Sequence, residues 1–555
     1  MIQSVNTDNP RPILSLYRGP RRQVFVAGVV GRKGGKHRHY FWAGPESAGG
    51  KSSNRQHTVA TPVAVDRLYT ETMPGFHIEH FGCRAARADG EAVSDRLRVA
   101  ELCAVNPATA DVVVVNTCSV TAEADRAARA FIRRTHRLNP AARIVVTGCY
   151  AQRAPEELAG MKGVAAVVGN SHKALAPKII LSLLGRATPH TGNGLIQIQA
   201  ATNLERAMSE QLAPQQAIWA DDRFAHSFLE ETQIVPGAQT RPNLKIQEGC
   251  GNRCTFCVIP FTRGPSKSLP AASVLRQVEG FVAAGGNELV LSGINLGRWG
   301  RDLESAGKQT MAGLVREIFE QTALNRLRLS SIEPMDWDDE LMGLMAEFGG
   351  IRLARHAHLP LQSGSDAVLR RMHRRYRPWH YVEKVEALLR ACGPELTLGA
   401  DVMVGFPGES EVEFEETMAL VRALPFGYLH LFPFSPRPAT PGWELHAARP
   451  VPAEAVAERM AALRALATEK SKTHRRSFVG RELEAITLHT PAELAAHGRS
   501  AALTENFLPV ELEGRLEANH LVRVRVTGMN AEGTLEGLID LHSFTSRSSV
   551  RNAAV

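Results

Sequence analysis

Apolar runs and amphipathic segments alternate along residues 73–185. Val- and Ile-rich runs predict strands at 77–82, 111–118, 143–150 and 164–170. Segments with helical periodicity between these runs predict helices at 90–102, 122–138, 154–160 and 172–184. Near-continuous apolar strands that alternate with helices are typical of a parallel sheet covered on both faces. We therefore expect an N-terminal α/β domain built on a parallel sheet.

A second strand–helix series occupies residues 241–474. Its apolar runs predict six strands, at 243–247, 288–293, 326–331, 357–362, 398–405 and 428–434. Helical patterns fall between them, for example at 271–285 and 380–392, and a helix near 452–474 closes the series. Six such units in about 200 residues favour a partial (β/α)6 barrel, in which sites form at the carboxyl ends of the strands.

The remaining segments differ in character. Residues 475–543 show short β patterns separated by glycines, which favours a small antiparallel β-barrel. Residues 186–240 lose the strand–helix rhythm and are interpreted as a linker with one helix around 220–231. Residues 1–72, rich in Gly, Ser, Pro and Arg, are interpreted as a disordered or spurious extension, and 544–555 as a tail.

Charge and cysteine content limit the function classes. The net charge is +8, but residues 1–72 hold 11 Lys/Arg and 4 Asp/Glu, so the basic total says little about the rest of the chain. No apolar run approaches the roughly 18 residues that a membrane span needs, and no signal peptide is recognised. Eight cysteines in 555 residues do not form a disulfide framework. We expect a cytoplasmic, reduced protein without a membrane partner.

Three cysteines lie close together directly after the first strand of the predicted barrel. Cys250, Cys254 and Cys257 form a C-x3-C-x2-C pattern with no second half nearby. A structural zinc site needs four ligands, whereas three thiolates suit an iron–sulfur cluster with one iron left open. The alternatives are a partial zinc site completed by histidine, or chance clustering.

Three further cysteines each follow a strand of the N-terminal domain. Cys83, Cys118 and Cys149 come after its first three predicted strands, whose carboxyl ends share one sheet edge. They could converge on a second metal centre, or each could be a small buried apolar residue. Cys103, inside a predicted helix, and Cys392, at a predicted helix end, are assigned to packing.

The segment IQEGCGNRCTFCVIPFTRGPSKS (246–268) resembles the cluster motif of radical S-adenosylmethionine (SAM) enzymes. NTCSVTAEADRAARAFIRR (116–134) and VVTGCYAQ (145–152) are similar to the N-terminal domain of the methylthiotransferases in that superfamily. The resemblance implies that Cys250, Cys254 and Cys257 hold a 4Fe–4S cluster whose open iron chelates SAM and reduces it to a 5′-deoxyadenosyl radical. It also implies a second 4Fe–4S cluster on Cys83, Cys118 and Cys149, which handles the inserted sulfur.

One position departs from the family pattern. Methylthiotransferases usually carry Asn-Gln shortly after the first cysteine, where this chain has Ala86 and Arg87. Polar groups at such positions support a cluster from outside its ligand shell. The departure leaves the ligands intact and brings cluster tuning into question.

Other residues are expected at the cofactor. The resemblance places the Gly-rich segment with Gly285, Gly286 and Glu288 against the SAM amino group, although Gly-Gly is also a common helix stop. Four polar residues end predicted strands and are expected to face the cavity or to organise its loops. Glu333 and Asp401 are assigned to the cofactor, and Gln362 and Ser363 to the substrate.

Two basic segments are candidates for RNA contact. The segment LRRMHRRYR (369–377) could hold RNA phosphates or form a solvated face; the candidates are Arg370, Arg371, Arg374 and Arg375. The C-terminal barrel resembles the TRAM RNA-binding domain in SAALTENFLPVELEG (500–514) and LVRVRVTGMNAEGTLEG (521–537). Residues 471–555 hold 10 Lys/Arg and 10 Asp/Glu, so binding there would need a local pair such as Arg523 with Arg525.

The motif surroundings are most similar to one branch of the family. LKIQEGCGNRC (244–254) and GINLGRWGRDL (293–303) resemble the branch that methylthiolates carbon 2 of N6-threonylcarbamoyladenosine at position 37 of tRNA. That branch implies the tRNA anticodon loop, SAM, a sulfur donor and an electron donor such as flavodoxin or ferredoxin as partners. The alternatives are the isopentenyladenosine branch, a ribosomal-protein aspartate as substrate, and a non-catalytic RNA-binding protein with a structural metal.

Overall fold

The computed structural model describes residues 73–185, 217–224, 239–303 and 309–540, together with single residues between 229 and 236. All of them belong to one compact unit. The predicted extension 1–72 and the predicted tail 544–555 lie outside the described residues. Of the helix expected around 220–231, residues 220–224 are described and are not helical.

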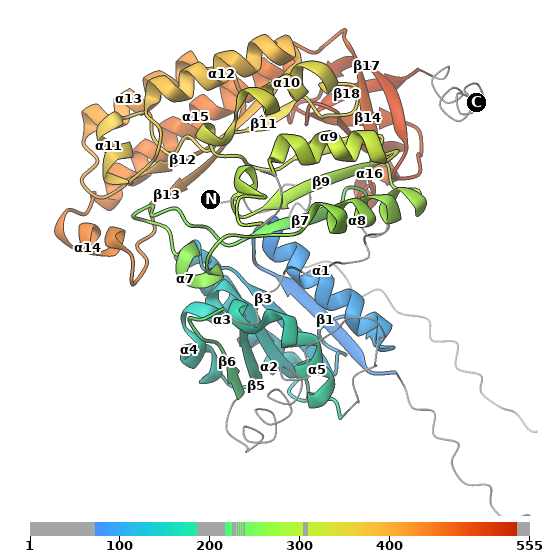
Figure 1. The fold of residues 1–555 in the computed structure, drawn as a ribbon, viewed down its shortest axis with the longest axis vertical. Helices are drawn as coiled ribbons and strands as arrows, with labels where there is room; N and C mark the ends of the chain where they lie inside the picture. Colours follow the sequence, from blue (N-terminus) through green and yellow to red (C-terminus); the bar gives the residue numbers. More distant parts are fainter. Residues whose placement is uncertain are drawn as a thin grey trace, which may run out of the picture. The chain divides into compact units, whose positions relative to one another are not determined.

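The N-terminal part of the chain forms a six-stranded, fully parallel sheet in the order β2-β1-β3-β4-β5-β6 (Figure 1). Its strands are β1 Gly75–His80, β2 Cys103–Ala104, β3 Val112–Thr117, β4 Arg143–Gly148, β5 Val164–Gly169 and β6 Ala217–Trp219. The predicted parallel sheet is confirmed. The structure adds two short edge strands that the pattern did not reveal: β2, directly after the helix predicted at 90–102, and β6, inside the predicted linker.

Helices cover both faces of this sheet. On one face α1 (Arg84–Val99) and α5 (Ala176–Leu183) pack against Val112 and Val114, and the alternating residues Val113 and Val115 face the other side. There the sheet is covered by α2 (Ala122–Leu138), α3 (Cys149–Arg153) and α4 (Pro155–Ala159). A 3-10 helix, η1 (Asn170–Leu175), follows β5. Helix α1 begins six residues before the predicted helix, directly after Cys83.

The central part of the chain forms a partial barrel of six parallel strands. They are β7 Asn243–Glu248, β9 Glu288–Gly293, β10 Arg326–Leu329, β11 His356–His358, β12 Thr397–Val404 and β13 Phe426–Pro433. The strands form two sheets, β10-β9-β7-β8 and β11-β12-β13, where β8 (Lys267–Ser268) is a short antiparallel addition. An isolated bridge joins Leu327 of β10 to Leu353, three residues before β11. The predicted (β/α)6 arrangement is therefore confirmed.

Helices and short 3-10 turns surround this barrel. The α-helices are α7 Ile259–Arg263, α8 Ala271–Ala283, α9 Met311–Gln321, α10 Asp339–Phe348, α11 Asp366–Arg371, α12 Pro378–Cys392, α13 Glu411–Ala423, α14 Pro441–Ala448 and α15 Ala453–Arg476. The 3-10 helices are η2 Leu296–Arg298, η3 Pro334–Asp336 and η4 Gly393–Glu395. The largest apolar core lies between these helices and the strands. None of the described helices is both long and apolar enough to cross a membrane.

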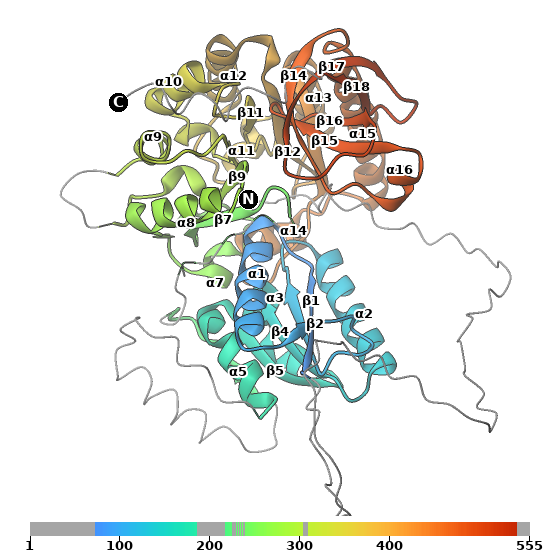
Figure 2. The ribbon, with the colours of Figure 1, turned by 90° about the vertical axis from the view of Figure 1, so that its right-hand side faces the viewer.

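The C-terminal segment is a closed five-stranded barrel, drawn in red in Figures 1 and 2. Its strands, in the closed order β14-β15-β16-β18-β17, are β14 Glu482–Thr487, β15 Arg499–Thr504, β16 Pro509–Glu513, β17 Leu521–Met529 and β18 Leu535–Ile539, with a short helix α16 Ala492–Ala496. Four neighbouring pairs are antiparallel and β16–β18 is parallel. The predicted small barrel is confirmed, with this one parallel pair as a difference.

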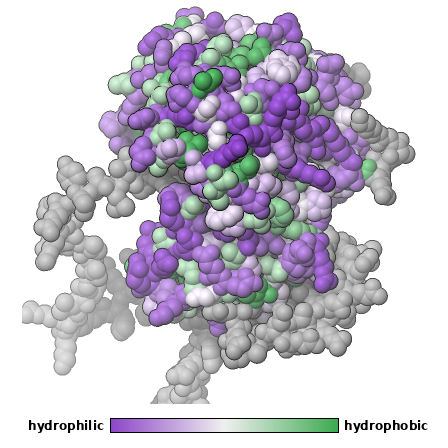
Figure 3. Space-filling view, turned by 90° about the vertical axis from the view of Figure 1, so that its left-hand side faces the viewer, coloured by the Kyte–Doolittle hydropathy of each residue, from purple (hydrophilic) through white to green (hydrophobic). Residues whose placement is uncertain are grey.

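The C-terminal barrel contacts the amino ends of β9 and β10. Arg326, at the start of β10, donates to Glu484 at 2.6 Å, and Arg328 donates to the Thr504 carbonyl at 3.3 Å. The amino end of the partial barrel is therefore occupied by protein. On the face that Figure 3 shows, apolar side chains are scattered among hydrophilic ones rather than gathered in one patch.

Candidate functional site

The barrel cysteines lie on a tight loop that begins two residues after β7. Gly249 has a φ of +69°, and a Cβ there would lie 1.9 Å from the Pro265 carbonyl oxygen, so the turn requires glycine. The amide of Cys250 donates to the Gly264 carbonyl at 3.1 Å, and the amide of Cys257 donates to the Cys254 carbonyl at 3.1 Å. The backbone thus folds the three cysteines into one loop at the carboxyl end of β7, as predicted.

Hydrogen-bond donors point at the sulfurs of this loop. Asn295 Nδ2 lies 3.6 Å from Cys250 Sγ, and Arg374 Nη1 lies 3.4 Å from Cys254 Sγ. Burial raises the pKa of Cys250, and it raises the pKa of Cys257 to about 11. These thiols must therefore lose their protons when a metal binds, and donors beside sulfur stabilise the thiolates that iron–sulfur clusters need.

A cavity of about 290 Å³ opens beside Cys254. Its lining includes Asn252, Glu333, Arg374 and Arg375. Glu333 follows β10, and its carboxylate pairs with the buried Arg374. The structure therefore brings Glu333, Arg374 and Arg375 to the barrel cysteines.

The three N-terminal cysteines also come together. Cys83 caps the start of α1, Cys118 follows β3, and Cys149 begins α3 directly after β4. All three line one small cavity. Burial raises the pKa of Cys83, and it raises the pKa of Cys118 to about 12. The thiols after the first three predicted strands thus share one edge of the sheet.

Two side chains that the sequence reasoning missed bind Cys149. Its Sγ accepts from Arg263 Nε at 3.3 Å and from Asn170 Nδ2 at 3.4 Å. Arg263 lies at the end of α7, six residues after Cys257 on the barrel loop. The only signal in the sequence is the Arg-Gly pair at the end of the cysteine motif.

Arg263 belongs to a buried network of five charged side chains. Its Nη1 donates to Glu248 at 2.6 Å and to Asp89 at 3.0 Å. Lys173 and Lys245 each pair with both of these carboxylates. Three basic and two acidic groups leave a formal surplus of one positive charge beside Cys149, which favours a net negative group at the thiols.

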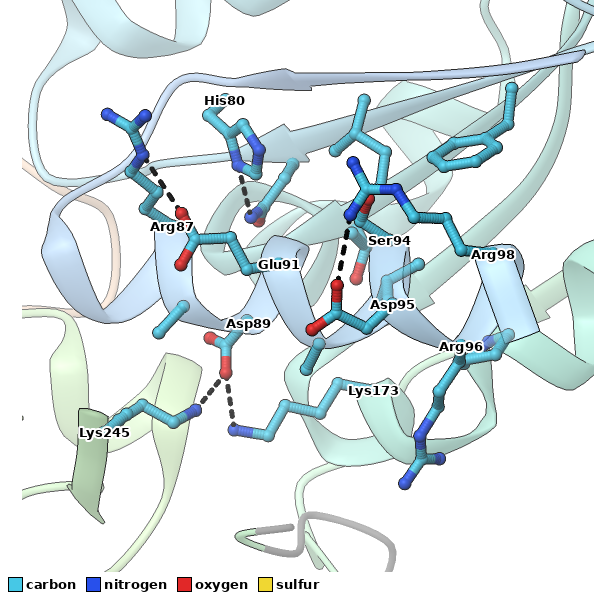
Figure 4. A pocket seen from close by; sticks show the side chains of 18 of the residues that line it. His80, Arg87, Asp89, Glu91, Ser94, Asp95, Arg96, Arg98, Lys173 and Lys245 are labelled. Atoms are coloured by element: carbon cyan, nitrogen blue, oxygen red, sulfur yellow. Dashed lines mark hydrogen bonds and ion pairs between the residues drawn. The ribbon is translucent and has the colours of Figure 1, made fainter. Parts of the chain in front are cut away.

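A cavity of about 400 Å³ borders this network (Figure 4). Asp89, Lys173 and Lys245 lie on its lining, and Figure 4 shows both lysines pointing at Asp89 from separate elements. Arg263 and Glu248 are at most 1% exposed. The network therefore extends from a cavity wall to the sulfur of Cys149.

The two cysteine groups are neighbours. Cys83 of the N-terminal group and Cys250 and Cys257 of the barrel group pack around one apolar cluster that includes Ile259 and Ile294. The loop that carries the barrel cysteines also supplies Arg263 to Cys149. One loop therefore contacts both groups.

The departure at Ala86 and Arg87 has a visible local effect. Ala86 is buried and lines the cavity of the N-terminal cysteines, and its carbonyl accepts from Asn116. Arg87 points to Glu91, with Nε 3.3 Å from the carboxylate. An amide donor reaches Cys149 from Asn170.

Gly285, Gly286 and Glu288 are not brought to the cysteines, which corrects the expectation that they contact the cofactor. Gly285, with a φ of +85°, and Gly286 end α8 through bonds to Val282 and Phe281, so the helix-stop interpretation holds. Glu288 lies at the amino end of β9, opposite the cysteine loop. Burial alone would raise the pKa of Glu288, but the surrounding arginines lower it to about 2.

The other strand-end residues, Ser363, Gln362 and Asp401, have different surroundings in the structure. Ser363 is buried and its Oγ lies 3.0 Å from Thr417 Oγ1, so it organises the loop onto α13. Gln362 has a φ of +63°, and both polar atoms of its buried side chain have no hydrogen-bond partner. Asp401 is buried in β12, beside His358 and His430.

The candidate RNA-contacting arginines differ in exposure. Arg374 is buried and paired with Glu333, which corrects its assignment to RNA phosphates. Arg371 is held by Glu413 through two bonds of 2.8 Å. The exposed candidates are Arg370, Arg375, Arg523 and Arg525. Arg370 forms an ion pair with Asp366.

The two cysteines assigned to packing have different outcomes. Cys392 ends α12 and is buried, as expected. Cys103 is exposed in edge strand β2, so its assignment to a packed helix is wrong.

Comparisons with known proteins agree with this arrangement. A family described as "Uncharacterized protein family UPF0004" matches residues 75–169, and the radical SAM superfamily matches residues 244–421. The threonylcarbamoyladenosine tRNA methylthiotransferase MtaB of Aquifex aeolicus is 34% identical over 418 residues, which cover 75% of this chain and 91% of that protein. MtaB of Bacillus subtilis is 34% identical over 420 residues, covering 75% and 86%.

A relative of another branch matches at similar identity. The tRNA-2-methylthio-N(6)-dimethylallyladenosine synthase of Cereibacter sphaeroides is 32% identical over 467 residues, covering 83% of this chain and 97% of that protein. Identity alone therefore does not select the substrate. These matches extend over both cysteine groups, and the chain belongs to the radical SAM family of tRNA methylthiotransferases.

Proposed function

We propose that this enzyme methylthiolates carbon 2 of N6-threonylcarbamoyladenosine at position 37 of tRNA. The observation that carries the proposal is the meeting of two cysteine trios around one small apolar cluster. Cys250, Cys254 and Cys257 would hold the 4Fe–4S cluster that binds SAM, and Cys83, Cys118 and Cys149 a second one. When bound, these clusters supply the electron that cleaves SAM and the sulfur that is inserted.

The thiols and donors in the chain fit such groups. Each trio offers three sulfurs, and each has side-chain N–H groups aimed at a sulfur. Arg263 and Asn170 would orient and stabilise the N-terminal thiolates, as Asn295 and Arg374 would at the barrel loop. Ala86 contributes no polar group, so this support comes from more distant parts of the sequence.

The cavity beside Cys254 suits the amino-acid part of SAM. Glu333 and Arg374 line it with one carboxylate and one guanidinium, the complements of an ammonium and a carboxylate. The side chains would hold SAM against the open iron and keep it from leaving. Of the five residues first assigned to the cofactor, Glu333 is the one whose position supports this role.

The substrate branch is supported by the polar face of the β11-β12-β13 sheet. His358, Asp401 and His430 lie on the side of the sheet opposite the apolar residues that pack against the helices. Arg84, the residue after Cys83, has its guanidinium 6.0 Å from the Phe507 ring, which also contacts Tyr428. A polar surface favours a substituent with a carboxylate over an apolar isopentenyl group.

The target base must leave the anticodon-loop stack to reach this face. Exposed Arg375 on the cavity lining, Arg370 on α11, and Arg523 and Arg525 on β17 would bind phosphates of the tRNA. The reaction also needs an electron donor, such as flavodoxin or ferredoxin, and a sulfur donor.

Mass spectrometry of tRNA nucleosides tests the substrate. The gene is deleted, and the deletion strain is complemented with the wild-type chain or with Cys118→Ala. Loss of 2-methylthio-threonylcarbamoyladenosine that only the wild-type chain restores supports the proposal. Loss of the isopentenyl derivative assigns the enzyme to the other branch, and an unchanged profile favours a ribosomal-protein aspartate. A purified chain with zinc but no iron or sulfide would instead indicate a non-catalytic RNA-binding protein.

A further inference from the structure

A second type of ligand set lies on the polar face of the β11-β12-β13 sheet. His358 ends β11, Asp401 lies in β12, and His430 lies in β13, directly opposite Asp401 in the strand register. One ligand atom of each side chain lies within 4.8 Å of the other two. Asp401 Oδ1 is 3.2 Å from His430 Nδ1 and 3.4 Å from His358 Nε2.

Asp401 differs from the other buried carboxylates that the structure describes. Each of the others forms an ion pair with at least one arginine or lysine; they are Asp125, Glu248, Glu288, Glu333, Asp336, Glu409 and Glu505. The ion pairs of Asp401 are with histidines alone. A buried carboxylate requires a compensating charge, which at Asp401 comes either from these histidines or from a bound cation.

Hydrogen bonding is also incomplete within this group of three side chains. His358 Nε2 and Asp401 Oδ2 are buried and have no hydrogen-bond partner. His358 Nε2 thus lies 3.4 Å from Asp401 Oδ1 without forming a hydrogen bond.

Ser331 fixes the remaining nitrogen of His358. Its Oγ lies 2.9 Å from His358 Nδ1. With the proton on Nδ1 and donated to Ser331, Nε2 presents a lone pair to the centre of the group. Metal-ligating histidines have this arrangement, because their second nitrogen is held by a hydrogen bond from outside the ligand shell.

We propose that His358, Asp401 and His430 bind one divalent first-row transition-metal ion such as Zn²⁺, separate from both cysteine groups. Two imidazole nitrogens and a carboxylate suit zinc or ferrous iron and suit Mg²⁺ or Ca²⁺ poorly. The ion neutralises Asp401 and gives partners to the unpartnered atoms. Three protein ligands leave a coordination position open for an oxygen donor.

That open position gives the site a role in substrate binding, an extension that rests on the proposed function. The threonylcarbamoyl group carries a carboxylate, which is an oxygen ligand for such an ion. The ion would then hold the substituent of the target adenine, while the cysteine groups serve the chemistry.

The test measures Zn²⁺ on the full-length holoprotein, with both iron–sulfur clusters assembled anaerobically so that the six thiols are occupied. After zinc is removed with a mild chelator, Zn²⁺ is added back and bound zinc is counted by mass spectrometry. Wild-type protein should retain about one zinc per chain, and His358→Ala/His430→Ala and Asp401→Asn should lose at least tenfold in zinc affinity. Glu409→Gln is the matched control, because Glu409 is equally buried but already paired with Arg459.

A wild-type chain that binds no Zn²⁺ overturns the proposal, as does zinc binding that the His358, His430 and Asp401 variants leave unchanged. If those variants fail to fold, anomalous diffraction at the zinc edge from wild-type crystals decides, since a peak must lie between the three side chains. Zinc is counted without tRNA. A negative result therefore leaves the proposed reaction standing, and failure of the tRNA experiment leaves the zinc count standing.

Discussion

Arg263→Gln should lower the reduction potential of the N-terminal cluster while leaving the chain folded. The substitution removes the guanidinium whose Nε lies 3.3 Å from Cys149 Sγ. It leaves Lys173 and Lys245 facing Asp89 and Glu248, a balanced set of two basic and two acidic groups. Lost hydrogen bonds should cost the cluster-free chain about 1–3 kcal/mol, less than the loss of a partner from an isolated buried ion pair.

The size of the redox effect follows from Coulomb's law. Two unit charges at the 3.3 Å separation of Arg263 Nε and Cys149 Sγ interact by about 5 kcal/mol at an effective dielectric constant of about 20. An added electron is spread over a cluster, so about half of this applies to reduction. For a one-electron couple, about 2.5 kcal/mol corresponds to roughly 100 mV. Arg263→Gln should therefore lower the potential by on the order of 100 mV.

The assay is a redox titration followed by electron paramagnetic resonance. Cys250, Cys254 and Cys257 are replaced by alanine, so that only the N-terminal cluster contributes to the signal. Arg263→Lys is the matched control, because it keeps the positive charge and should retain most of the wild-type potential. Circular dichroism establishes that each variant is folded. A folded Arg263→Gln variant whose potential lies within about 20 mV of wild type would refute the electrostatic role of this arginine.

Further predictions concern the barrel. Gly249→Ala should lower the melting temperature by several degrees and deplete the barrel cluster, because its Cβ would clash with backbone, whereas Gly251→Ala has open space and should do neither. Glu288→Gln should make the free energy of unfolding of the cluster-free chain less dependent on pH in acid. Because the pKa of Glu288 is depressed to about 2, its ionised carboxylate stabilises the fold above pH 4.5 by about 3 kcal/mol. This contribution is lost as the pH falls towards 2. Gln362→Met should raise the unfolding free energy by about 1 kcal/mol, because both buried amide atoms lack partners, and should lower turnover if that amide binds cofactor or substrate.

Each of these has a contrary result. Equal iron content in the alanine variants at 249 and 251 would mean that the turn does not position the cysteines. If the Glu288→Gln chain lost stability in acid as strongly as wild type, protonation of groups other than Glu288 would cause the acid transition. A destabilised Gln362→Met variant with full turnover would assign Gln362 to the loop structure alone.

Much of the site could be predicted because its residues follow from strand ends. Cys118 and Cys149 each come directly after a Val-rich strand, and parallel strands bring their carboxyl ends to one edge. The barrel trio lies within eight positions, so its convergence needed no tertiary information. These placements depend on the local hydrophobic pattern and on the parallel topology that it predicts, and both can be inferred from the sequence.

Other features depend on contacts between distant residues. Arg263 and Cys149 are 114 positions apart, and no periodicity links them. Gly285 and Glu288 were misplaced because a Gly-rich turn before a strand resembles a cofactor loop, while the strand direction puts it at the opposite end of the barrel. Arg374 lies in an arginine-rich run that suggests an exposed surface, yet in the structure it is buried and forms an ion pair with Glu333.

Iron and sulfide counting on the anaerobically reconstituted chain tests the central claim most directly. Two 4Fe–4S clusters require about eight iron and eight sulfide per wild-type chain. Replacing Cys83, Cys118 and Cys149 with alanine should leave about four of each, and so should replacing Cys250, Cys254 and Cys257. A wild-type chain with only about four iron, unchanged when the N-terminal trio is removed, would contradict the account.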